Sequence, residues 1–251
     1  MDKKETTQFR GFAATLNYYA PDCPDLQFVA KEVSRDMSNP SLRSWKKLKR
    51  AARYLVGREA LVWKYVYQAP VDNLTVWIDS DWGGSREMRK STSGGAVMWG
   101  SHCWKTWSTT QGATALSSAE AEFYAMVDGV QRSKYLCTIA SELGVSALRQ
   151  NIILGTDSEA AKSFVARRGL GRMRHIEVRD LWLQEEVRKG NVTVTKLPGT
   201  ENAADLMTKY LSRTEVGDRL AGLSVFVKRP AVDVWAAMVA GRRLRWADDA
   251  W

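Results

Sequence analysis

A succession of three short strands, followed by alternating helices and strands, constrains the fold of this chain more than any other feature. Residues 74–79, 94–100 and 103–109 read as strands, with a turn at Gly100 and Ser101 between the last two. The elements expected after them are a helix from about Ser118 to Leu143, a strand at 152–156, helices at 158–167 and 176–189, a strand at 192–197 and a helix at 201–211. Strands in succession favour an antiparallel meander, and the later strand–helix–strand units favour parallel additions to it. The sequence therefore predicts an α/β domain with a mixed five-stranded sheet flanked by helices.

The residues before this domain are expected to be mostly helical. Residues 7–37 have helical character on both sides of a break at Pro21 and Pro24. A further helix is expected at 40–56, with Asn39 as its N-cap and apolar residues at helical spacing. We therefore expect three parts in the chain: a helical segment over 1–70, the α/β domain over 71–211 and a tail without an assigned role over 212–251.

Positive charge is concentrated towards the N-terminus. The chain has 37 Lys and Arg against 28 Asp and Glu, a net charge of +9, and residues 1–70 hold 13 of these basic and 7 of these acidic residues. Such an excess favours anionic partners, nucleic acid above all. The expected helix at 40–56 carries six cations: Arg43, Lys46, Lys47, Lys49, Arg50 and Arg53. They form either a solvated basic face or a stripe that contacts a phosphate backbone.

Cysteine usage and hydropathy favour an intracellular location. Cys23, Cys103 and Cys137 are odd in number and far apart, which gives neither a disulfide framework nor a zinc-ligand spacing. No apolar run reaches about 18 residues, the length expected of a membrane-spanning helix. We therefore expect a reducing compartment, either cytoplasm or nucleus, and no membrane partner.

Four carboxylates are placed where the predicted fold can bring them together. Asp79 ends the first strand, Asp157 follows the fourth, and Glu122 and Asp205 lie in the first turns of the two helices that begin near 118 and 201. Converging carboxylates repel each other unless a cation lies among them, and an all-oxygen ligand set suits Mg²⁺ or Mn²⁺. Two such ions, roughly 3.5–4 Å apart, would activate water and stabilise the leaving oxygen of a phosphodiester. The alternative is that each Asp is a turn or cap residue, as Asp157 could be for the helix that follows it.

Four segments, in order, resemble the ribonuclease H domain of copia-type retroelement polyproteins. They are WIDSDWGGSREMRKSTSGG (77–95), ALSSAEAEFYAM (115–126), ILGTDSEAAK (153–162) and LPGTENAADLMTKYL (197–211). Upstream, residues 9–57 resemble the segment that connects reverse transcriptase to ribonuclease H in the same polyproteins. The resemblance therefore covers roughly residues 9–211, and the last 40 residues match no family that we can name.

The resemblance implies a ribonuclease H-like fold and hydrolysis of the RNA strand of RNA–DNA hybrids, with Mg²⁺ or Mn²⁺, two ions in all, as cofactor. The partners it implies are the hybrid and reverse transcriptase. The metal ligands and catalytic residues it implies are Asp79, Glu122, Asp157 and Asp205. The first alternative is a catalytically inactive remnant that only binds nucleic acid or reverse transcriptase. The second is another enzyme on the same fold, such as an integrase-like strand-transfer nuclease, over which the Glu early in the long helix and the closing Ala-Asp helix favour ribonuclease H.

Several positions keep two interpretations at this stage. Glu120 has capping-box spacing from Ser117, whereas Glu122 fits the ribonuclease H pattern of Glu, large apolar, any residue and Ala, so we expect Glu122 to be the ligand. Lys90, Ser91 and Thr92 either contact phosphates or stabilise a turn. The family's mobile His before the last acidic helix is missing, and His175 is either a structural or phosphate-contacting residue or a proton shuttle. The residues expected to contact nucleic acid are Lys46, Lys47, Lys49, Arg50, Lys90, Ser91, Thr92 and His175.

Overall fold

The computed structural model describes residues 1–85, 88–145, 148, 151–171 and 175–229. The chain forms two compact units: unit 1 is Met1–Trp63 together with the segment that begins at Val225, and unit 2 is Lys64–Ser224. The three-part division at residues 70 and 211 stays a prediction. Most of the tail expected at 212–251 lies outside the described residues.

Unit 1 is mostly helical, as expected. Helices α1 (Lys3–Tyr19) and α2 (Pro24–Arg35) are separated by a 3-10 turn, η1 (Ala20–Asp22), and α3 spans Leu42–Val56. The predicted N-cap of the third helix is wrong: Ser41, not Asn39, caps it. The Ser41 hydroxyl accepts the Ser44 N–H, and the Ser44 hydroxyl accepts the Ser41 N–H, so the two side chains satisfy each other's backbone donors. The apolar faces of the helices meet in a small core that includes Phe9, Ala13, Leu16, Leu26, Ala30, Val33 and Leu48.

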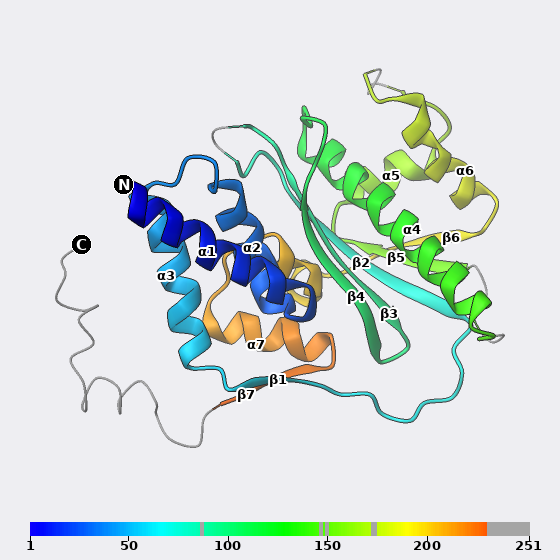
Figure 1. The fold of residues 1–251 in the computed structure, drawn as a ribbon. Helices are drawn as coiled ribbons and strands as arrows, with labels where there is room; N and C mark the ends of the chain where they lie inside the picture. Colours follow the sequence, from blue (N-terminus) through cyan, green and yellow to red (C-terminus); the bar gives the residue numbers. More distant parts are fainter. Residues whose placement is uncertain (86–87, 146–147, 149–150, 172–174, 230–251) are drawn as a thin grey trace. The chain divides into compact units, whose positions relative to one another are not determined.

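A two-stranded antiparallel ribbon completes unit 1. Strand β1 (Ala60–Trp63) pairs with β7 (Val225–Lys228), and Figure 1 shows the two strands side by side. The helix α7 (Arg213–Gly222) belongs to unit 2 and precedes β7 in the chain. None of these three elements was expected from the sequence. Of the described helices, none is both long and apolar enough to cross a membrane.

Unit 2 contains the mixed five-stranded sheet that the element order predicts. Its strands are β2 (Asn73–Asp81), β3 (Thr92–Trp99), β4 (His102–Thr110), β5 (Asn151–Thr156) and β6 (Val192–Lys196). Their order across the sheet is β4-β3-β2-β5-β6. The first three pair antiparallel, and β5 and β6 are added in parallel on the other side of β2. Strand β2 is therefore central, with an antiparallel neighbour on one side and a parallel neighbour on the other.

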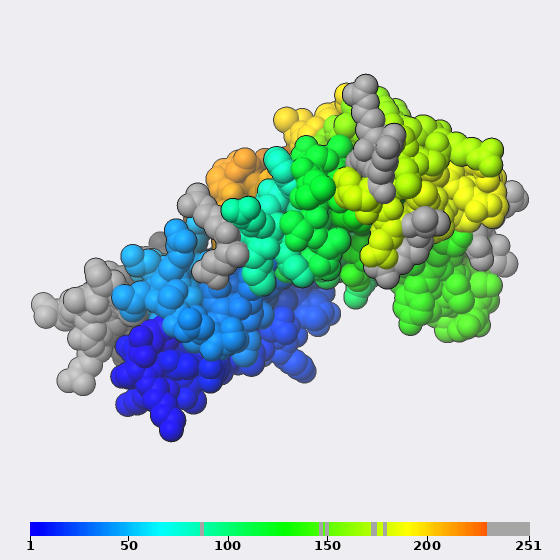
Figure 2. Space-filling view, turned by 90° about the horizontal axis from the view of Figure 1, so that it is seen from above, coloured from blue at the N-terminus to red at the C-terminus, as the bar shows by residue number. Residues whose placement is uncertain are grey.

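Helices α4 (Ser118–Glu142), α5 (Glu159–Ala166) and α6 (Trp182–Arg188) pack against one face of this sheet. Figure 1 shows α4 lying along the strands, and Figure 2 shows the surfaces of α4 (green) and of the α5–α6 region (yellow-green to yellow) side by side. Leu74, Val76 and Ile78 alternate along β2 and are fully buried in the same core as Phe123 of α4. Helix α4 comes very close to β2, because a Cβ at Gly129 would lie 2.7 Å from Ile78 Cγ2.

Two expected helices differ in the structure: one is shorter, and the other is replaced by 3-10 turns. The segment expected to be helical at 176–189 is a 3-10 turn, η2 (Val178–Leu181), followed by α6. The helix expected at 201–211 is instead two 3-10 turns, η3 (Gly199–Glu201) and η4 (Ala203–Met207). Asn202 lies between them with extended backbone angles; its side chain accepts the Ala204 N–H and donates to Ile78 O. This fully buried tie to β2 holds the chain in tight turns against the sheet.

We expect Gly95→Ala to destabilise the protein by about 1–3 kcal/mol, because the added methyl group overpacks the core. A Cβ at Gly95 would lie 2.2 Å from the buried Trp107 ring and 2.8 Å from Trp77 O. Urea unfolding of the variant, compared with wild type, measures this change. Gly112→Ala is the matched control, since nothing lies within 4 Å of that position. Equal unfolding midpoints for the two variants would contradict this close approach.

Candidate metal centre

Three of the four predicted carboxylates come together at one end of the sheet. Asp79, Glu122 and Asp157 each offer an oxygen, and these oxygens lie within 4.8 Å of one another. Asp79 and Glu122 are buried and Asp157 is partly exposed. We call these three residues the acidic cluster.

Strand register brings the two aspartates together. Strands β2 and β5 are parallel neighbours in which Trp77 is paired with Gly155. Asp79 and Asp157 each lie two residues further along, so both carboxylates leave the sheet at the same end. Gly199, which begins η3, lies next to this end, because a Cβ there would be 3.3 Å from Asp157 Oδ2.

Helix α4 supplies the third carboxylate of the acidic cluster. Glu122 Oε1 accepts a hydrogen bond from Ser80 N at 3.0 Å, which fixes the side chain beside the end of β2. Glu122 Oε2 is buried and has no hydrogen-bond partner among the described residues. Burial and the nearby Asp79 and Asp157 raise the pKa of Glu122 to about 9. An orphaned oxygen among carboxylates that oppose one another's ionisation fits a site for a divalent cation.

Asp79 faces the turn η4 on the other side of the sheet from α4. Its partner on β3 is Gly94, where a Cβ would lie 2.6 Å from Thr208 Cγ2, so the missing side chain lets this turn approach. The Thr208 hydroxyl donates to Asp79 Oδ2, and Lys209 Nζ lies 3.3 Å from the same oxygen. Burial raises the pKa of Asp79 even though Lys209 and Thr208 act in the opposite direction.

Asp205, the fourth predicted carboxylate, lies in η4 and is bound by two basic side chains. Lys209 Nζ is 2.7 Å from Asp205 Oδ1, and Arg219 Nη2, on α7, is 3.0 Å from Asp205 Oδ2. Asp205 is not part of the acidic cluster. Burial lowers the pKa of Lys209, but the Asp79 and Asp205 carboxylates outweigh this effect and raise the pKa above its ordinary value. Sequence reasoning missed Lys209 and Arg219, although the four-residue spacing from Asp205 to Lys209 was a usable signal.

Glu120 points away from the acidic cluster. Ser117 caps α4 by accepting the Glu120 N–H, but the Glu120 carboxylate accepts the Leu116 N–H at 2.9 Å rather than that of Ser117, so only half of the expected capping box forms. The same oxygen lies 2.8 Å from His175 Nε2. Glu120 is fully buried and the His175 side chain is 43% exposed. His175 is thus tied to a structural carboxylate, with its ring accessible to solvent.

The other predicted nucleic-acid contacts differ in accessibility. Ser91 and Thr92 are fully buried, and the Ser91 hydroxyl accepts the Gly83 N–H, which is a turn-stabilising contact. On α3, Lys46 is exposed, whereas Lys47 forms ion pairs with Asp36 at 3.0 Å and Glu32 at 3.6 Å. Of the remaining three, Arg50 is exposed, while Lys49 and Lys90 are partly exposed. Their contacts with nucleic acid stay predictions.

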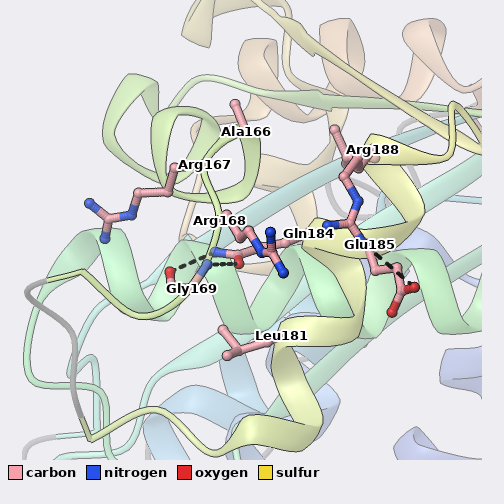
Figure 3. A pocket seen from close by; sticks show the side chains of 9 residues that line it. Ala166, Arg167, Arg168, Gly169, Leu181, Gln184, Glu185 and Arg188 are labelled. Atoms are coloured by element: carbon pink, nitrogen blue, oxygen red, sulfur yellow. Dashed lines mark hydrogen bonds and ion pairs between the residues drawn. The ribbon is translucent and has the colours of Figure 1, made fainter.

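A pocket of about 500 Å³ lies apart from the acidic cluster. It is formed by the end of α5, the residues that follow it and α6, and Figure 3 shows Arg167, Arg168 and Arg188 around it. Gln184 donates to Phe164 O and Gly169 O and accepts the Gly169 N–H, which holds the loop after α5 in place. The nine residues that line the pocket include none of the predicted carboxylates.

Comparisons with known proteins find relatives among transposon polyproteins. No family model matches the chain. The chain is 28% identical over 213 residues to the retrovirus-related Pol polyprotein from transposon RE1 of Arabidopsis thaliana, covering 84% of this chain and 14% of that protein. It is 30% identical over 208 residues to the corresponding polyprotein from transposon TNT 1-94 of Nicotiana tabacum, covering 78% and 15%. Among solved structures, ribonuclease H1 of Halobacterium salinarum is 19% identical, with a TM-score of 0.38 over 54% of this chain and 94% of that one.

The strand order of unit 2 and the helices on its face define the class: this is a ribonuclease H-like α/β fold preceded by a helical segment. The chain is a homologue of the retrovirus-related Pol polyproteins of transposons. It spans about one seventh of the length of the curated relatives that it matches first.

Without divalent cations, we expect Glu122→Gln to be more stable than wild type at neutral pH. Folding raises the pKa of the Glu122 carboxyl group from 4.5 to about 9. The stability that this group contributes is therefore fully present below pH 4.5 and is lost as the pH rises towards 9. The amide keeps an oxygen for the Ser80 N–H and carries no charge. Each kcal/mol gained corresponds to roughly 2–4 °C in melting temperature for a chain of this size.

Thermal melts in a chelator between pH 5 and 8 measure this effect, and the advantage of the variant should grow with pH. Added Mg²⁺ should stabilise wild type and have little effect on Glu122→Gln. Glu120→Gln is the control, because its carboxylate lies outside the acidic cluster, and it should keep the response to Mg²⁺. A wild-type protein that melts at the same temperature with and without Mg²⁺ would contradict a metal site here.

Proposed function

We propose that this chain is a ribonuclease H that hydrolyses the RNA strand of RNA–DNA hybrids in a divalent-metal-dependent reaction. The observation that carries the proposal is the acidic cluster, with its orphaned oxygen, at the end of the two central parallel strands. The homology to transposon Pol polyproteins supports the choice of a nucleic-acid substrate. In the parent element, this activity would degrade the RNA template after it has been copied.

Asp79, Glu122 and Asp157 would hold the divalent ion, with Mg²⁺ or Mn²⁺ favoured by an all-carboxylate ligand set. When bound, the ion would supply positive charge to the phosphodiester and promote ionisation of the attacking water. Asp205 completes the predicted set of catalytic and metal-binding residues, and two ions are expected from the sequence.

The residues of the chain orient the site before any substrate arrives. The Ser80 N–H holds Glu122, and the Thr208 hydroxyl holds Asp79, so neither carboxylate has to be ordered at the moment of reaction. Asp157 is the partly exposed member of the cluster, so an ion held there would be accessible to a phosphodiester from solvent. The products would carry a 3′-hydroxyl and a 5′-phosphate, as in the family that the sequence resembles.

Recognition of the hybrid would come from outside the acidic cluster, because carboxylates repel phosphate. We propose that the DNA strand is held through its phosphates and the RNA strand through its 2′-hydroxyl groups. Of the predicted contacts, we propose Lys90 and the accessible face of His175 in unit 2. Ser91 and Thr92, which were also predicted, are fully buried. In unit 1 we propose Lys46, Lys49 and Arg50 of α3, whereas Lys47 is held by Asp36 and Glu32. The N-terminal helical segment would be the connection to reverse transcriptase, the second proposed partner, in the parent polyprotein.

We expect the purified chain to cleave a labelled RNA–DNA hybrid in the presence of Mg²⁺ or Mn²⁺, and to leave duplex DNA, duplex RNA and single-stranded RNA intact. Asp79→Asn or Asp157→Asn should reduce this cleavage by at least about a thousandfold, since each removes a metal ligand worth several kcal/mol. Asp128→Asn is the matched control: that aspartate pairs with Arg132 on α4, outside the acidic cluster, and its loss should leave the rate unchanged. If wild type binds the hybrid but does not cleave it when metal is present, the inactive, nucleic-acid-binding alternative is favoured.

A second prediction concerns the cations of α3. Each phosphate that a cation neutralises contributes about 0.9 to the slope of log affinity against log salt concentration. Lys46 is exposed, so Lys46→Gln should lower that slope by about 0.9 for every hybrid sequence, because backbone contacts carry no base information. Lys47 is paired with Asp36 and Glu32, so Lys47→Gln should leave the slope near the wild-type value. Salt titrations of hybrid binding measure both, and parallel lines for wild type and Lys46→Gln would favour a solvated basic face.

A further inference from the structure

Lys209 places a positive charge between two of the predicted metal ligands. Its ammonium group lies 2.7 Å from Asp205 Oδ1 and 3.3 Å from Asp79 Oδ2. The turn η4 sets this position, because the Lys209 N–H donates to Asp205 O at 3.0 Å and so directs the side chain back over the same aspartate. The ammonium group therefore bridges the two carboxylates as a metal ion would.

Arg219 engages the other oxygen of Asp205. Its Nη2 lies 3.0 Å from Asp205 Oδ2 and also donates to Gly199 O at 3.3 Å, and its Nη1 donates to Thr200 O. The Arg219 side chain is 13% exposed, so this contact is largely shielded from solvent. Both oxygens of Asp205 are thus bound by basic groups of the chain.

The basic side chains are unevenly distributed over the four carboxylates. In the described part of the chain, Glu122 and Asp157 form no ion pair with Lys or Arg, and Glu122 Oε2 has no partner at all. One divalent ion at the acidic cluster, together with Lys209 and Arg219, would balance the four negative charges. A second divalent ion next to Asp205 would have to displace Lys209 and would leave the site with an excess of positive charge.

We propose that the ammonium group of Lys209 takes the place of one of the two divalent ions, so that the free chain binds a single ion, at Asp79, Glu122 and Asp157. The inference deepens the proposed function and rests on its metal centre. Lys209 acts here as a positioning residue: it holds Asp79 and Asp205 at a fixed separation and makes binding of a second ion unfavourable.

The test is a Mn²⁺ titration of the full chain without nucleic acid. Calorimetry measures the heat of binding, and electron paramagnetic resonance measures the concentration of free Mn²⁺. Wild type should bind one Mn²⁺ per chain. Lys209→Met keeps the approximate length of the side chain without its charge. This variant should bind two ions, and it should bind the second at least about tenfold more tightly than wild type binds any second ion. Lys196→Met is the matched control, since Lys196 pairs with Glu159 and not with the four carboxylates, and it should still bind one ion.

Lys209→Arg is a second control, because it changes the side chain but keeps the positive charge. It should bind one ion, as wild type does. Circular dichroism checks that each variant is folded. Two ions of similar affinity on wild type, or one ion on a folded Lys209→Met, would overturn the inference whatever the other variants do.

Cleavage of the RNA–DNA hybrid, measured on the same preparations, separates this inference from the proposed function. Two tightly bound ions on a wild-type chain that cleaves the hybrid would overturn the role of Lys209 and leave the ribonuclease standing. One ion on wild type and two on Lys209→Met, without cleavage by wild type, would support the role of Lys209 and overturn the ribonuclease.

Discussion

Mutual repulsion of carboxylates at the end of β2 and β5 is the constraint on which much of unit 2 depends. Asp79, Glu122 and Asp157 approach one another in a largely buried place, where their ionised forms are costly without a cation. The surrounding structure holds them there regardless: strand register fixes the aspartates, the Ser80 N–H fixes Glu122, and Thr208 fixes Asp79. An arrangement that opposes its own stability in this way is typical of functional sites.

The sequence alone predicts the parts of this fold that depend on local patterns. Alternation along β2 and the turn at Gly100 identify the meander, and each aspartate is recognisable as the residue at or just beyond a strand end. The choice of Glu122 over Glu120 needed the resemblance to a family, because both lie in the first turns of one helix. In the structure, the Glu120 carboxylate binds the Leu116 N–H and His175, and that of Glu122 joins the acidic cluster.

What the sequence did not predict depends on contacts between distant residues. Asn202 keeps η4 from becoming a longer helix by binding Ile78 O, which is 124 residues away in the chain. Arg219 reaches Asp205 from a helix that the sequence reading did not identify. Strands β1 and β7 have four residues each and lie more than 160 residues apart, so neither carries a recognisable local pattern. In each case a tertiary contact, and not a propensity, decides the local structure.

The pairing of β1 with β7 also determines how the chain connects its two units. After β1, the chain enters unit 2 at Lys64, and it leaves unit 2 at Ser224 to form β7. The Lys64 N–H donates to Ser224 O at 2.9 Å. The two ends of unit 2 are thus held together, and the whole of unit 2 is inserted into a two-stranded hairpin of unit 1. Domains with adjacent termini are the ones most readily exchanged or inserted between hosts. Unit 2 is therefore a separable insertion: a short turn in its place would join β1 directly to β7, and the two strands would keep their pairing.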